Sequence, residues 1–241
     1  MIKVDMKKYF FISFVFISCF SFSQSIATDR PSAQTDNSYS LYHKAFQLES
    51  GLMYSYSNGE VNSSSLPNLL LRYGAFDIIE FRFSSDLLLS PVENIISTSP
   101  IQLGTKIQII RKDDFQLAFL SMVTFDSINQ NTLTKLVGGN SITENFGIGY
   151  TLGHNYAASN YFDSFNYSIF LSNSFNSKIT GFLEFYGDWN YNSGIYNSTI
   201  NFDFGGSYLL NDKMQLDAYF GKGLNNDLYF GSIGFSYLFI K

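Results

Sequence analysis

The chain has 241 residues and a formal net charge of −5, and only 15% of its residues are charged although 26 are Phe and 17 are Tyr. A soluble domain usually carries about 25% charged residues, so a water-exposed surface this poor in charge would tend to associate. The acidic balance argues against nucleic acid as a partner, and the length suits a single domain.

Residues 1–23 have the features of a secretory signal peptide. Lys3, Lys7 and Lys8 precede an apolar run, and Ser21-Phe22-Ser23 offers a small-x-small cleavage site. The apolar run is too short to span a bilayer as a helix, which takes about 20 residues. Cys19 is the only cysteine and lies in this segment, so the mature chain would have no thiol. A lipoprotein signal cleaved before Cys19 is the alternative.

Residues 24–43 are polar, rich in turn-forming residues and without a sustained hydrophobic period. We predict a periplasmic N-terminal tail here. The alternative is a segment that folds back into the domain that follows, where Asp29 and Arg30 could pair with buried charges.

Residues 44–241 show a period of two: along 79–84 the chain reads Ile-Glu-Phe-Arg-Phe-Ser, and along 200–205 it reads Ile-Asn-Phe-Asp-Phe-Gly. Successive side chains of a strand point to opposite faces, so this pattern predicts strands with one apolar and one polar face. Twelve strands are predicted, at 44–57, 66–74, 78–88, 101–111, 115–126, 131–139, 144–154, 164–175, 179–190, 198–210, 214–222 and 229–240.

The connections predict the strand count. Tight turns at 75–77, 112–114, 176–178 and 211–213 alternate with longer connections at 58–65, 89–100 and 155–163. Short turns on one side and long loops on the other are typical of outer-membrane barrels, which have even strand numbers. Residues 131–139 are weakly patterned, but a strand is needed there if all tight turns lie on one side.

Two architectures share this alternation. A soluble barrel or sandwich would turn its apolar face inward, whereas a membrane barrel turns it toward lipid. Lys or Arg facing mid-bilayer costs about 2–4 kcal/mol, and the charged residues keep to one face here, together with glycines such as Gly147 and Gly205. We therefore predict an all-β fold, an antiparallel transmembrane β-barrel of about 12 strands in the outer membrane of a Gram-negative cell.

The lumen should contain the charged residues of the polar face. Glu49, Arg72, Glu80 and Arg82 come from the first three predicted strands, and they could form a selectivity constriction or a structural ion-pair network. Glu184, Asp203 and Asp217 come from three consecutive later strands. They could form an acidic wall, or Lys106 or Arg30 could reach across to neutralise them. These eight strand residues, Lys106 included, are the candidate solute pathway.

Several stretches resemble the outer-membrane barrel family described as transporters of the phenol meta-cleavage pathway. They are Thr28-Asp29-Arg30-Pro31, Phe46 to Gly51, Leu71 to Gly74 with Ile79 to Arg82, Leu103 to Lys106, and Gln215 to Asp217. The resemblance covers most of the mature chain and implies a membrane barrel with a transport function. It does not imply a particular substrate.

The function that this sequence predicts is passive diffusion of a small solute, which could be hydrophobic or aromatic. A barrel closed by its own side chains and tail, with a structural or adhesive role, is the alternative. Expected partners are outer-membrane lipid, the small-molecule solute and the barrel-assembly machinery. Enzymatic activity, a cofactor and a metal site are not expected, because His43 and His154 are the only histidines and no serine is placed beside either.

Overall fold

The computed structural model describes residues 26–30, 32–57, 60–90, 95–125, 130–157, 162–192 and 194–239. The predicted signal peptide, with Cys19, lies outside these residues. Within the described ranges, no helix is long and apolar enough to cross a membrane.

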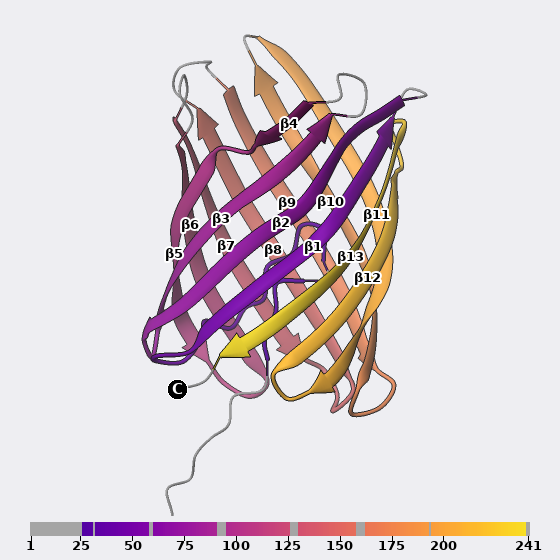
Figure 1. Cartoon of the computed structure of the whole chain (residues 1–241). Helices are drawn as coiled ribbons and strands as arrows, with labels where there is room; N and C mark the ends of the chain where they lie inside the picture. The colour runs from indigo at the N-terminus through magenta and orange to yellow at the C-terminus, as the bar shows by residue number, and fades with distance from the viewer. Residues whose placement is uncertain are drawn as a thin grey trace, which may run out of the picture.

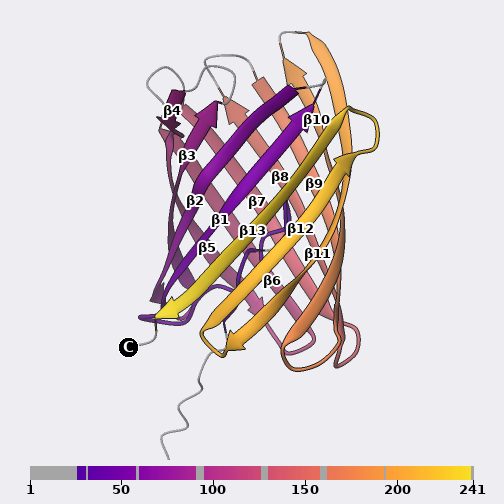
Figure 2. The same cartoon turned by 45° about the vertical axis from the view of Figure 1, so that its right-hand side comes forward.

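The described residues form strands joined in antiparallel pairs, and twelve of them close into a barrel (Figures 1 and 2). Their bounds are β1 (Phe46–Ser57), β2 (Glu60–Phe76), β3 (Ile79–Ser90), β4 (Ile95–Thr98), β5 (Ile101–Arg111), β6 (Phe115–Phe125), β7 (Gln130–Ser141), β8 (Phe146–Ala157), β9 (Phe162–Ser174), β10 (Ile179–Asn192), β11 (Ile195–Asn211), β12 (Met214–Gly223) and β13 (Leu228–Phe239). The barrel closes where β1 pairs with β13, from Phe46 opposite Phe239 to Ser57 opposite Leu228.

All twelve predicted strands are present, including the weakly patterned segment that became β7. The strand β4 was not predicted; it pairs only with the last residues of β3 and stands outside the ring. The longer connections were partly wrong, because β2 begins at Glu60 and β3 runs to Ser90, inside segments predicted as loops. We call the end of the barrel that carries β4 and the longer connections the loop end. The end with the connections at 77–78, 112–114 and 212–213 is the turn end.

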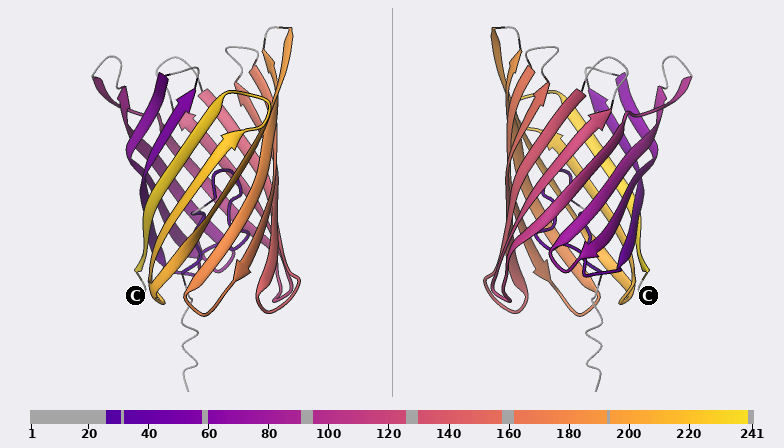
Figure 3. Two further views of the ribbon diagram at one scale, coloured as in Figure 1. Left: turned by 90° about the vertical axis from the view of Figure 1, so that its right-hand side faces the viewer. Right: turned by 90° about the vertical axis from the view of Figure 1, so that its left-hand side faces the viewer.

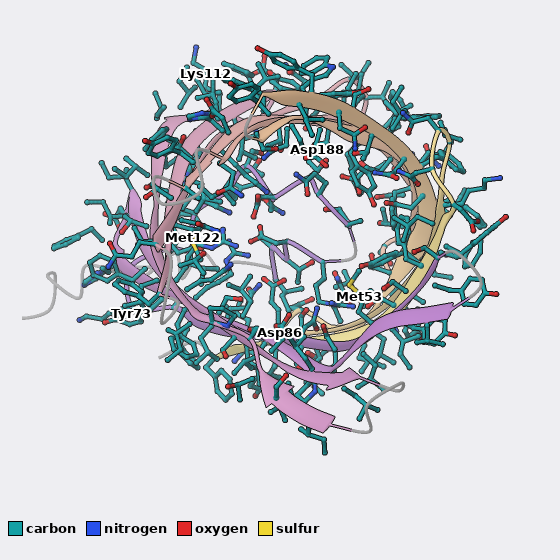
Figure 4. The ribbon with its side chains drawn as sticks, turned by 90° about the horizontal axis from the view of Figure 1, so that it is seen from above. Met53, Tyr73, Asp86, Lys112, Met122 and Asp188 are labelled. Carbon is teal, nitrogen blue, oxygen red and sulfur yellow. The ribbon has the colours of Figure 1, made fainter. Side chains whose placement is uncertain are left out.

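The apolar face points outward, as predicted. Phe81 and Ile233 are 51% and 58% exposed, whereas Asp203 is fully buried. Seen from above, Tyr73 points away from the barrel, while Asp86 and Asp188 point into it from opposite walls (Figure 4). A barrel that exposed so many apolar side chains to water would associate with other molecules, so this outer face is the surface that contacts lipid.

Replacing Phe185 by Arg tests this orientation. Phe185 is 44% exposed on the outer face of β10, where its ring lies 4.9 Å from that of Phe202. We expect Phe185→Arg to lower the free energy of unfolding from lipid vesicles by about 2–4 kcal/mol, because the guanidinium would lie near mid-bilayer. Tyr196→Arg at the loop-end rim is the matched control and should cost about 0–1 kcal/mol. Equal costs in urea titrations would contradict the lipid-facing assignment.

The described residues of the segment 26–43, which we call the tail, lie inside the barrel (Figures 1 and 3). The tail enters at the turn end, where the Ile26 N–H donates to Asp212 O at 3.0 Å. It returns to the same end, where the Lys44 N–H donates to Gly74 O at 2.7 Å and Leu41 packs against Leu238. The sequence allowed two interpretations of this segment. The described residues fold back into the barrel, as the alternative had it, and do not form a free periplasmic tail.

Candidate functional site: the barrel lumen and its tail

All eight predicted pathway residues point into the barrel and are buried. None of them is more than 6% exposed: Glu49, Arg72, Glu80, Arg82, Lys106, Glu184, Asp203 and Asp217. The alternation placed them on the lumen face correctly. What fills the space between them is the tail, and it supplies most of their partners. Their part in solute passage stays a prediction.

Arg72 is the centre of an ion-pair network on the first three strands. Its Nη1 lies 2.8 Å from Glu49 Oε1 and its Nε lies 2.8 Å from Glu80 Oε1. The three residues meet because Arg72 on β2 lies between β1 and β3, where Glu49 and Glu80 are each two residues along from its direct partners Gln47 and Arg82, on the same inward face. Arg72 Nη1 also donates to the tail carbonyl of Ala27 at 2.6 Å. Each nitrogen of the guanidinium therefore has a partner.

Asp29 of the tail receives the remaining cations of this wall. Its carboxylate lies 3.2 Å from Lys106 Nζ and 3.7 Å from Arg72 Nη1, and it also pairs with Arg82. Burial alone would raise the pKa of Asp29, but Arg72, Arg82 and Lys106 outweigh burial and hold this pKa well below its ordinary value. Asp29 is thus ionised at neutral pH. Lys106 pairs with Asp29 and does not neutralise the acidic wall.

A second tail carboxylate, Asp36, was missed in the sequence. It pairs with Lys135 Nζ at 2.7 Å and with Arg82 Nη2 at 3.3 Å. Lys135 was missed as well, because β7 carries the weakest alternation. Its neighbours of the same parity, Leu133 and Val137, are apolar, so the alternation gave no signal that Lys135 faces inward.

Arg30 of the tail lies against the neighbouring wall of β1, β13 and β12 and pairs with Asp217, as one alternative had it. Its Nη2 lies 3.0 Å from Asp217 Oδ1 and donates to Ser232 Oγ at 2.7 Å. The guanidinium occupies the space left by Gly51 and Gly234: an added Cβ at Gly51 would lie 2.6 Å from Arg30 Nη2. Glycines on the polar face therefore leave room for the tail.

Carboxylates of the barrel wall also bind the tail backbone. Glu49 accepts from the N–H groups of Asp29 and Arg30 at 3.0 and 3.1 Å. Glu184 on β10 accepts from those of Ala33 and Thr35 at 2.8 and 2.7 Å. An irregular segment has no sheet to satisfy its N–H groups, and these carboxylates supply the missing acceptors.

Asp203 differs from the other lumen charges. It lies on β11 directly opposite Glu184 and is fully buried, yet no donor among the described residues reaches either carboxylate oxygen, and the group within hydrogen-bonding reach is the Glu184 carboxylate. Of the three carboxylates in the predicted acidic wall, Asp217 is neutralised by Arg30, and Glu184 accepts hydrogen bonds from the tail backbone. Asp203 has no cation and no donor beside it among the described residues.

Two cavities lie on either side of the tail. The turn-end cavity, of about 210 Å³, is bounded on the wall by Gln116, Gly139 and Gly147. The loop-end cavity, of about 250 Å³, is bounded by Met53, Asp86, Lys135 and Tyr219. Five tail residues line both cavities: Asp29, Arg30, Ser32, Thr35 and Asp36.

The two histidines lie away from the lumen network. His154 pairs with Asp163 near the loop-end rim, and His43 Nδ1 lies 2.7 Å from Ala75 O at the turn end. In the part of the chain that the structure describes, no three His, Cys, Asp or Glu side chains gather as metal ligands.

Comparisons with solved structures agree with this architecture. A KdgM porin in complex with disordered oligogalacturonate matches with a TM-score of 0.58 and 12% identity over 80% of this chain and 99% of that one. A NanC porin matches with a TM-score of 0.63 and 11% identity over 79% of this chain and 98% of the other. The COG4313 outer membrane channel from Pseudomonas putida F1 gives 0.62 and 12%, over 83% and 97%. This chain has the fold of outer-membrane barrel channels.

At such low identity the likeness shows the fold alone. No protein-family model and no curated protein sequence matches the chain. The resemblance to the phenol meta-pathway family therefore stays a prediction.

Proposed function

We propose that this protein is an outer-membrane channel for passive diffusion of a small solute, with the tail as its constriction. The observation that carries the proposal is that the same five tail residues line both cavities. The tail thus lies between the two cavities of the lumen. Twelve strands lie between the eight that side chains can fill and the 16 to 18 of wide aqueous porins, which fits a narrow pore.

Orientation follows from the connections. Barrels of this class have short periplasmic turns, so the turn end faces the periplasm and the loop end faces outside. A solute enters the loop-end cavity, passes the tail and leaves through the turn-end cavity. The eight wall residues named above become its surroundings where the tail moves aside. Selection rests on size and weak binding, with no covalent step. An aromatic solute is the finer proposal, in keeping with the phenol-pathway resemblance.

Deleting the tail tests the channel. We expect a variant lacking residues 26–43 to give single-channel steps in planar bilayers several-fold larger than those of the full-length barrel, because the segment that lies between the two cavities is removed. Folding of the variant is checked by its heat-modifiable migration in gels. If neither protein conducts, the proposal is wrong.

That result would favour the second candidate, a structural barrel permanently closed by its tail. The firm attachment of the tail supports this candidate, because wall carboxylates bind its backbone at Asp29, Arg30, Ala33 and Thr35.

A further inference from the structure

The carboxylate of Asp203 has the Glu184 carboxylate beside it but no cation and no donor among the described residues, so it calls for a counter-charge. Its neighbours across the sheet offer none: Glu184 lies opposite it on β10, and Gly221 lies opposite it on β12. Burying an ionised carboxylate without a partner is costly, so either a proton or a cation must complete this position.

Aromatic rings surround the same position. The Phe230 ring lies 6.1 Å from that of Tyr186 and 6.2 Å from that of Tyr219, both edge to face. A Cβ added at Gly221 would lie 2.6 Å from Asp203 Cβ and would collide with the Phe230 ring. Gly221 therefore allows Phe230 to lie beside Asp203. Ala33 of the tail packs against this aromatic cluster.

The approach from the loop end is acidic. Asp86 and Asp188 point into the lumen there (Figure 4), and neither has an ion pair among the described residues. Three described cations line the loop-end cavity, and each already pairs with a carboxylate: Arg30 with Asp217, Arg82 with Asp29 and Lys135 with Asp36. Carboxylates that line a pore attract cations.

We propose that Asp203 and its aromatic neighbours form a binding site for an organic ammonium ion with an aromatic body. The ammonium group pairs with Asp203, and the rings of Phe230, Tyr186 and Tyr219 supply cation–π and ring contacts. Because Asp203 has no exposed surface and Ala33 covers the cluster, the ligand displaces this part of the tail. The inference rests on the proposed channel function, and it makes ligand binding and tail release coupled events.

Benzylammonium and benzoate test the site, since they share a ring and differ in the sign of the charge. We expect the folded barrel in detergent to bind benzylammonium at least about tenfold more tightly than benzoate, and Asp203→Asn to remove most of that difference. The tail-deletion variant should bind benzylammonium more tightly than the full chain. Asp113→Asn, at an exposed turn-end position, is the matched control and should change nothing.

Bilayer recordings give the second measurement. Reversal potentials across a benzylammonium benzoate gradient should show preference for the cation, and Asp203→Asn with Asp188→Asn should reduce that preference several-fold. An absence of conductance in every variant would overturn the channel function, while the binding arm would still decide this site. Equal binding by the native chain and Asp203→Asn would overturn the inference and leave a proton shared with Glu184. If Asp203→Asn does not fold, Phe230→Leu and Asp188→Asn replace it, with weaker binding expected from each.

Discussion

Replacing Arg72 by Ala should lower the free energy of unfolding by about 3–5 kcal/mol, the cost of removing one partner from a buried ion-pair network. Arg72 is fully buried and pairs with Glu49 and Glu80, each at 2.8 Å. Without it Glu49 loses the ion pair that the described structure gives it, and Glu80 keeps only the longer pair with Arg82, at 3.8 Å. The loss also removes donors to Ala27 and Tyr39, at 2.6 and 3.1 Å, that help to hold the tail.

The measurement is urea unfolding in lipid vesicles, followed by the fluorescence of Trp189, the single tryptophan of the chain. Arg111→Ala is the matched control. The Arg111 guanidinium lies 4.3 Å from the centre of the Tyr42 ring and donates to Ser40 O at 2.8 Å, but it has no ion pair among the described residues. Its removal should therefore cost about 1.5–3 kcal/mol, less than that of Arg72. Arg72→Lys keeps the positive charge but loses the paired N–H donors of the guanidinium, so its cost in unfolding free energy should lie between those of the other two variants. A midpoint for Arg72→Ala equal to that of Arg111→Ala would show that the network adds no stability.

The period of two was sufficient to predict the wall of the barrel. It identified every strand of the ring and the inward orientation of residues such as Glu80, Lys106 and Asp203, because the side-chain direction in a strand depends only on parity. It could not predict β4, a strand of four residues in which alternation has too few positions to be seen.

The tail was not predictable by the same means. Irregular backbone has no period, and a polar segment that fills a polar lumen has the composition of a free tail. Its position depends on matches between residues far apart in sequence, such as Arg30 with Asp217 and Asp29 with Lys106. The glycines of the polar face were a usable signal: they indicated space, and Gly51 and Gly234 show that Arg30 occupies it.

Reversing the charge at Asp29 should open the channel nearly as far as deleting the tail. An Arg at this position would lie among Arg72, Arg82 and Lys106, whose nitrogens now surround the carboxylate. Like charges in a space of low dielectric repel strongly, because such pairs are little screened by solvent or salt. We therefore expect Asp29→Arg to expel the tail and to raise single-channel conductance several-fold. Asp29→Asn, which removes the charge without adding a like one, should have a much smaller effect.

A reversible tether separates tail movement from a change in lumen charge. Thr35 Oγ1 of the tail lies 2.6 Å from Ser168 Oγ on β9, a distance that suits replacement of both residues by Cys. The chain has no cysteine after position 19, so this pair would be unambiguous. When Asp29→Arg is combined with the oxidised pair, conductance should fall to the native level, and reductant should restore the large steps. If the oxidised triple variant conducts as well as Asp29→Arg alone, the charge at position 29 acts on the ions in the lumen, and the tail is not the constriction.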